Sequence, residues 1–76
     1  MNQHQKEILL AQEIARVLND EKSLSLHIKF AKQYEEEFLK EMLDRVMSIP
    51  DSKITNSRGA LFNHLIQQNG RNHIRD

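Results

Sequence analysis

Apolar residues recur along this chain with the spacing of an α-helix, about one every 3.6 positions. The spacing is clear in four stretches, at about 5–18, 24–34, 36–48 and 58–69. No stretch shows the alternation of apolar and polar residues that is typical of a β-strand, and the chain has only one proline and two glycines. We therefore predict an all-α fold, a compact bundle of four short helices around a single core.

The predicted helices differ in how their apolar residues are distributed. In the first helix, apolar residues fill one half of the circumference: Ile8, Leu10, Ala11, Ile14, Ala15, Val17 and Leu18. Leu9 lies outside this half. The third helix is the clearest amphipathic segment, with a core face of Phe38, Leu39, Met42, Leu43, Val46 and Met47. The core face of the fourth helix is Leu61, Phe62, Leu65 and Ile66.

Polar residues and proline mark the ends of the first three helices. Asp20 or Ser23 can supply the N-cap oxygen of the second helix. No glycine or proline separates the second helix from the third, so these two helices could be continuous. Pro50 ends the third helix, because proline disfavours helical geometry in the residue before it.

The fourth helix has signals at both ends. Asn56 or Ser57 can cap its start, and Gly70 is expected at the C′ position, just after its last residue. We therefore expect residues 1–70 to form one helical domain and residues 71–76 to be a frayed tail.

Composition excludes several classes of protein. The chain has no cysteine, so neither a disulfide framework nor a thiolate metal site can form. The longest apolar run, Ile8 to Ala11, is far shorter than the roughly 18 residues of a membrane span, and Glu7 and Glu13 flank it. We expect a cytoplasmic protein that has no membrane partner.

Charge is distributed unevenly, although the formal net charge is zero. Residues 1–50 carry seven Lys or Arg and nine Asp or Glu, whereas residues 51–76 carry four and two. Residues 52–75 contain no acidic side chain at all. A surface of this kind can lie against a negatively charged partner without like-charge repulsion, so this segment is where we look first for function.

The fourth helix carries most of the polar side chains that could use this property. Its outer face and its ends present Arg58, Asn63, His64, Gln67, Gln68 and Arg71. Carboxamides and arginines make bidentate contacts to base edges, and arginines also neutralise phosphates. An acidic protein surface would suit the same side chains, and an ordinary solvated helix surface is the simplest alternative.

Gly59 opens the same helix, where a residue without a Cβ weakens helical structure. One interpretation is an anion site formed by backbone amides near Gly59 together with Arg58. The other is a neighbouring helix that packs too tightly for a Cβ, and the second is the one we favour.

His27 falls among the apolar residues of the second helix. We expect it to be buried, neutral and hydrogen-bonded to a carbonyl, with a pH switch as the alternative role. His4, His64 and His73 lie in separate segments without the spacing that holds zinc, so no metal site is predicted.

Catalytic patterns are missing from the sequence. No nucleophile–histidine arrangement, glycine-rich nucleotide loop or pair of inward carboxylates can be drawn. The three glutamates at 35–37 suit the positive end of a helix dipole. We predict that the protein is not an enzyme and that it needs no cofactor.

Residues 53–66 resemble a segment near the C-terminal end of some plasmid and phage replication-initiator proteins. The resemblance rests on Lys53-Ile54, the serine cap, the Ala60-Leu61-Phe62 run and the later Leu65-Ile66. The chain departs from that pattern at Arg58-Gly59, where a proline-centred cap is usual, and it is too short to contain the winged-helix domain of the initiators. The resemblance implies a DNA-replication accessory or a separate C-terminal helical module, and it transfers no DNA-reading residue.

Two functional hypotheses follow from the sequence. The first is a non-enzymatic helical module that binds nucleic acid or a protein through Arg58, Gly59, Asn63, His64, Gln67, Gln68 and Arg71. The second is a protein-interaction or homodimerisation domain whose apolar surface includes Leu9.

Overall fold

The computed structural model describes residues 4–75 and is all-α, as predicted. Its four helices are α1 (His4–Val17), α2 (Leu24–Gln33), α3 (Glu36–Ser48) and α4 (Arg58–Asn69). These bounds agree with the predicted ones to within one residue at each end. Three single turns of 3-10 helix join or extend them: η1 (Glu21–Ser23), η2 (Asp51–Lys53) and η3 (Gly70–Asn72).

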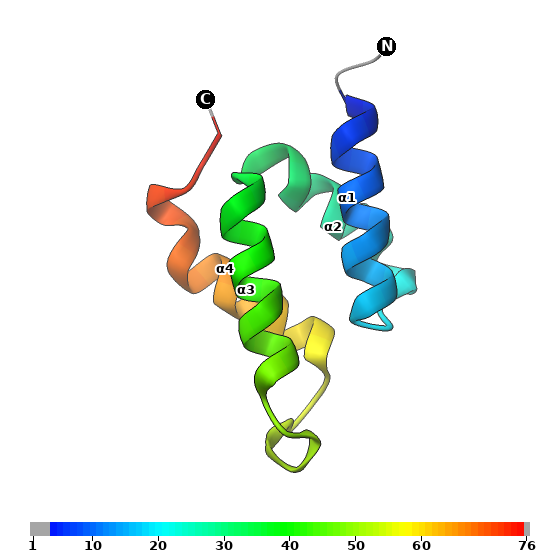
Figure 1. The fold of residues 1–76 in the computed structure, drawn as a ribbon, viewed down its shortest axis with the longest axis vertical. Coiled ribbons are helices and arrows are strands. Elements are labelled where there is room, and N and C mark those ends of the chain that lie inside the picture. Colours follow the sequence, from blue (N-terminus) through cyan, green and yellow to red (C-terminus); the bar gives the residue numbers. More distant parts are fainter. Residues whose placement is uncertain (1–3, 76) are drawn as a thin grey trace.

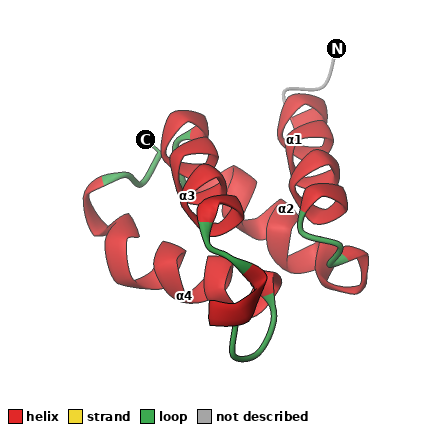
Figure 2. Cartoon of the chain, turned by 60° about the horizontal axis from the view of Figure 1, so that its bottom comes forward, coloured by secondary structure: helices red, strands yellow, loops and turns green. Residues whose placement is uncertain are grey.

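The helices form two packed pairs that share one core. α1 packs mainly against α2, and α3 packs mainly against α4 (Figure 1). The connections are short except for the loop between α3 and α4, which contains η2 (Figure 2). The rings of Phe30 and Phe62 meet edge to face with their centroids 6.5 Å apart, so α2 and α4 touch at the centre of the molecule.

The core contains most of the residues that helical periodicity assigned to it. The buried apolar residues include Leu10, Ile14, Leu18, Phe38, Leu39, Met42, Val46, Phe62 and Ile66. Val17 and Met47 were predicted to face inward, but their side chains are 39% and 42% exposed. Both lie in the last turn of their helices. Leu9 is 57% exposed, in agreement with its position outside the apolar half of α1.

The break between α2 and α3 is confirmed, and the C-terminal segment stabilises it. Tyr34 has an extended backbone and forms an isolated antiparallel bridge with Ile74. The Glu35 N–H donates to the His73 carbonyl oxygen over 2.8 Å, and the Arg75 N–H donates to the Gln33 carbonyl oxygen over 2.8 Å. These bonds satisfy backbone groups that the interrupted helix leaves without partners.

The prediction of a frayed tail is wrong for residues 71–75, and Asp76 lies outside the described residues. Arg75 Nε donates to the carbonyl oxygens of Ala31 and Tyr34, at 3.0 and 2.9 Å, so it caps the C-terminal end of α2. The His73 ring stacks on Phe38 with a centroid distance of 4.5 Å and an interplanar angle of 4°. The tail therefore holds α2 and α3 together.

The glycine at the end of α4 has a different role from the predicted one. Gly70 has right-handed dihedral angles, φ −80° and ψ −8°, and it continues the chain into η3. A Cβ at this position would overlap the Tyr34 ring, so close packing against α2 explains the glycine. The left-handed cap conformation expected for a C′ glycine is not adopted here.

Helix capping was predicted correctly at one of two places. Ser57 Oγ accepts a hydrogen bond of 3.0 Å from the Ala60 N–H, so it caps α4. Neither Asp20 nor Ser23 makes a side-chain cap for η1 or α2. The carboxylate of Asp20 bonds to His27 instead, which takes it away from the helix start.

Candidate functional site

The outer face of α4 is exposed and polar, as the sequence predicted. The side chains of His64, Gln67 and Gln68 are exposed, Asn63 is half-buried, and Arg71 is exposed in η3. Gln67 Nε2 donates to Asn63 Oδ1 over 3.3 Å, which orders this pair of carboxamides on the helix surface. The face extends over about 18 Å, the length of a twelve-residue helix.

The core residues of α4 determine which side chains point outward. Phe62 and Ile66 have no exposed surface, and they are four positions apart on one side of the helix. Burial of this ridge fixes the rotation of α4, so Asn63 and Gln67 must lie beside it on the outer side. The same periodicity that builds the core therefore builds the polar face.

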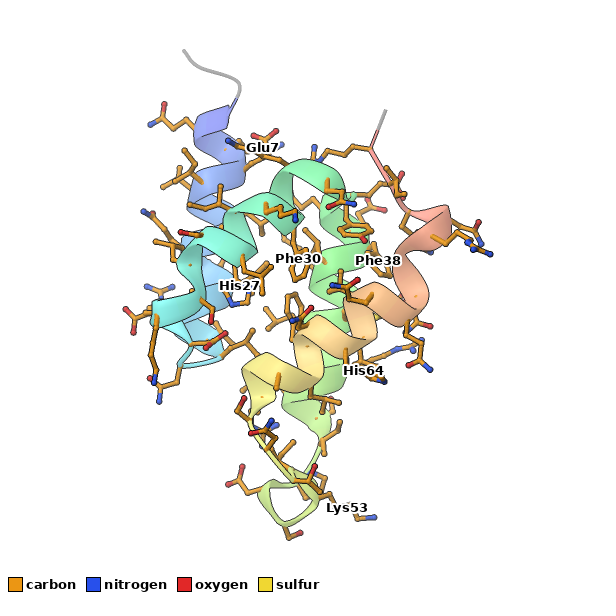
Figure 3. The ribbon with its side chains drawn as sticks, turned by 180° about the vertical axis from the view of Figure 1, so that it is seen from behind. Glu7, His27, Phe30, Phe38, Lys53 and His64 are labelled. Atoms are coloured by element: carbon orange, nitrogen blue, oxygen red, sulfur yellow. The ribbon has the colours of Figure 1, made fainter. Side chains whose placement is uncertain are left out.

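A shallow depression of about 310 Å³ adjoins the N-terminal end of this face. It is lined by the loop that precedes α4 and by the first two turns of the helix, and Lys53, Asn56 and His64 are among its polar residues. Figure 3 shows Lys53 in the loop and His64 on α4. We use the name "α4 surface" for Lys53, Asn56, Asn63, His64, Gln67, Gln68 and Arg71.

Lys53 and Asn56 were not among the predicted site residues. The sequence offered one signal for them, since the acid-free segment begins at Ser52, six residues before α4. Their position beside His64 depends on the fold of the loop, which helical periodicity does not predict.

Arg58 does not present a free guanidinium at this surface, contrary to the prediction. Its Nη1 donates to the Val46 carbonyl oxygen over 2.6 Å, and its Nη2 donates to Asp51 Oδ1 over 2.6 Å. The Arg58 side chain is only 19% exposed. Arg58 therefore ties the end of α3 to the loop and neutralises the carboxylate that lies nearest the acid-free segment.

Gly59 is buried and tightly packed, as the favoured interpretation expected, but its close neighbour is not a helix. A Cβ at this position would lie 2.5 Å from Asp20 Oδ2 and 2.6 Å from Asp20 Cγ. The neighbour is thus a side chain from the turn after α1. Because the protein's own carboxylate fills the space at Gly59, an external phosphate cannot use it, and the alternative interpretation of Gly59 as part of an anion site is wrong.

His27 is buried, as predicted, but its partner is a carboxylate. The side chain is 1% exposed, and its Nε2 lies 3.0 Å from Asp20 Oδ2. Its Nδ1 is buried without a hydrogen-bond partner among the described residues, and its ring lies 5.7 Å from that of Phe62. Figure 3 shows His27 in the interior near Phe30. His27, Asp20 and Gly59 therefore join α2, the preceding turn and α4.

Glu35 and Glu36 are engaged by residues outside the α4 surface. Glu35 Oε1 lies 3.3 Å from His73 Nδ1, and Glu36 Oε2 accepts a hydrogen bond of 2.9 Å from Lys40 Nζ. This hydrogen bond from Lys40 lowers the pKa of Glu36. No described carboxylate forms an ion pair with Lys53 or Arg71, so both cations are available to a partner.

Metal ligands and membrane-spanning helices are two other features of residues 4–75 that could indicate a function. In this range no group of three or more His, Cys, Asp and Glu side chains is placed to hold a metal ion. Among the described helices, none is long and apolar enough to cross a membrane. Comparisons with protein-family models, curated proteins and solved structures found no match to this chain. The resemblance of residues 53–66 to replication initiators therefore stays a prediction.

Proposed function

We propose that this protein is a small, non-enzymatic binding module that contacts nucleic acid through the α4 surface. The observation that carries the proposal is the amide-rich outer face of α4, with Lys53 before it and Arg71 after it, neither of them in an ion pair with a described carboxylate. Asp51, the acidic residue next to this surface in the sequence, is already paired with Arg58. A cytoplasmic location, expected from the sequence, is part of this proposal.

The chemistry of the α4 surface suits two kinds of contact. The carboxamides of Asn63, Gln67 and Gln68 can donate and accept hydrogen bonds at base edges. Lys53 and Arg71 lie before and after α4, and each can neutralise a phosphate. With two phosphate contacts, a plot of the logarithm of the binding constant against the logarithm of the salt concentration should have a slope of about −2 for duplex DNA. Binding should therefore be weak at physiological salt.

The test is a fluorescence-anisotropy titration of labelled duplex DNA and single-stranded RNA at low salt. Lys53→Glu with Arg71→Glu should weaken binding by about tenfold or more, because two attractive charges become repulsive. Lys29→Glu with Lys32→Glu is the matched control. Both lysines are exposed on α2, and this pair changes the net charge by the same amount.

Three results would contradict the proposal. Equal weakening in the two double variants would show that only net charge matters. Retention of full binding by the α4 variant would place the contact elsewhere. Failure of both nucleic acids to bind at low salt would favour an acidic protein surface as the partner.

A further inference from the structure

The depression that adjoins the α4 surface combines apolar and polar side chains. Its apolar lining is Ile54 and Leu61, which are half-buried, and Ala60, which is exposed. Lys53 and His64 also line it, and both are exposed. Its volume of about 310 Å³ is at the lower end of the range of small-molecule sites, about 300–1,000 Å³. Apolar surface is therefore open to water here beside a cation and an imidazole.

Hydrogen bonds on both sides of the depression hold its shape. The Ile54 N–H donates to the Asp51 carbonyl oxygen over 3.1 Å, which closes the η2 turn. Ser57 Oγ accepts a bond of 3.0 Å from the Ala60 N–H, which fixes the chain at the start of α4. Arg58 joins this loop to α3 through its bonds to Asp51 and to a main-chain carbonyl oxygen. The depression is therefore formed before a ligand binds, as small-molecule sites usually are.

A nucleobase has the chemistry that this depression requires. The faces of a base are apolar and its edge carries hydrogen-bond donors and acceptors. The rings can therefore cover Ile54 and Leu61 while the edge contacts the carboxamide of Asn56, which also lines the depression. The imidazole of His64 can stack on the base, and Lys53 can neutralise a phosphate next to it. The two ends of one nucleotide thus find their partners in the same place.

A single strand presents a base to this depression more readily than a duplex does. In a duplex each base is paired and stacked, and its removal from the stack costs free energy. We infer that the depression receives an unpaired nucleobase, so that the α4 surface binds single-stranded nucleic acid more tightly than duplex DNA. This inference rests on the proposed function of the α4 surface and adds the form of nucleic acid that the surface prefers.

The test compares two labelled single strands of about 12 nucleotides, one of deoxythymidine and one of abasic sites, by fluorescence anisotropy at low salt. Both strands carry the same phosphates, so the difference between their affinities measures the contribution of the bases. The deoxythymidine strand should bind about tenfold or more tightly than the abasic strand, and also more tightly than a duplex of the same length. A uridine strand distinguishes RNA from DNA, and base-dependent binding of either supports the inference.

Neutral substitutions in the depression test where the base binds. Ile54→Ser should weaken binding of the deoxythymidine strand by about threefold or more and leave binding of the abasic strand unchanged. Ile54 lies outside the buried core, so this variant should fold, which circular dichroism checks. His64→Ala should have the same effect and keeps a good helix former in α4. Leu9→Ser, at an exposed position of α1, is the matched control and should change neither affinity.

Two results would overturn this inference and leave the proposed function standing. One is equal binding of the deoxythymidine and abasic strands, because contacts to phosphates would then explain all of the affinity. The other is wild-type binding of the deoxythymidine strand by folded Ile54→Ser and His64→Ala variants. Failure of every single strand and of the duplex to bind at low salt would overturn the proposed function, and this inference with it.

Discussion

Substitution of Gly59 by alanine tests how α2 and α4 are joined in the interior. The new Cβ would lie 2.5 Å from Asp20 Oδ2, 2.6 Å from Asp20 Cγ and 3.1 Å from Asp20 Cβ. Such distances cannot persist, so the Asp20 side chain must rotate away. Its hydrogen bond to His27 Nε2 would then be lost, and the His27 ring would have no partner at either nitrogen.

The change in the free energy of unfolding caused by Gly59→Ala is the result of two opposing effects. A buried polar group left without its partner costs about 1–3 kcal/mol. Alanine in place of glycine stabilises a helix by up to about 1 kcal/mol, and less near its first turn. We therefore expect Gly59→Ala to lower the free energy of unfolding by about 1–2 kcal/mol. For a domain of this size the loss would be a large fraction of the total stability.

Urea denaturation followed by circular dichroism measures this effect, and a double-mutant cycle identifies its cause. In an Asp20→Ala background the carboxylate is absent, and only the 3.1 Å approach of the residue-20 Cβ remains. There, Gly59→Ala should be neutral or slightly stabilising. If Gly59→Ala stabilises the wild type, or if the two substitutions are additive, the contact assigned to Asp20 is wrong.

Three further predictions concern the tail, the loop and the start of α3. Arg75→Ala removes the donor that caps α2 and should lower the free energy of unfolding by about 1–3 kcal/mol, whereas the exposed Arg71→Ala should change it by less than about 0.5 kcal/mol. Equal effects in urea denaturation would contradict the role of the tail. Arg58→Ala removes the guanidinium bonds to the Val46 carbonyl oxygen and to Asp51. The Val46 carbonyl oxygen still accepts from the Ile49 N–H and Asp51 is exposed, so the substitution should lower the free energy of unfolding by about 0.5–1.5 kcal/mol in the same assay; an unchanged midpoint would refute this. The hydrogen bond from Lys40 lowers the pKa of Glu36 in the folded protein below its value in the unfolded chain. The ionised Glu36 therefore stabilises the folded protein fully above the unfolded pKa, and this stabilisation is lost as the pH falls through the folded pKa. Thermal melts of the wild type and Glu36→Gln should therefore converge as the pH falls below about 4, and a constant difference in Tm would contradict this.

The helices of this fold could be predicted because each buries a periodic ridge. Phe62 and Ile66 determine the rotation of α4, so the outward position of Asn63 and Gln67 could be inferred from the same spacing. This is why the polar face of the candidate site was predicted from the sequence.

Contacts between distant segments could not be predicted in this way. A Cβ at Gly59 would overlap the Asp20 side chain, and a Cβ at Gly70 would overlap the Tyr34 ring. Each of these neighbours lies more than thirty positions away from its glycine in the sequence. Arg58 was predicted to contact a partner and Arg75 to lie in a frayed tail, yet both donate to backbone carbonyls elsewhere in the fold. Helical periodicity describes which side of a helix is buried, and it contains no information about which donor reaches which carbonyl.

We propose above that nucleic acid binds at the α4 surface. The most direct test is a titration of ¹⁵N-labelled protein with duplex DNA at low salt, followed by heteronuclear NMR. We predict that the side-chain amide signals of Asn63, Gln67 and Gln68 and the backbone signals of Lys53 and Arg71 shift together, while those of α1 stay in place. Shifts confined to α1 and α2, or no shifts at all, would contradict the claim.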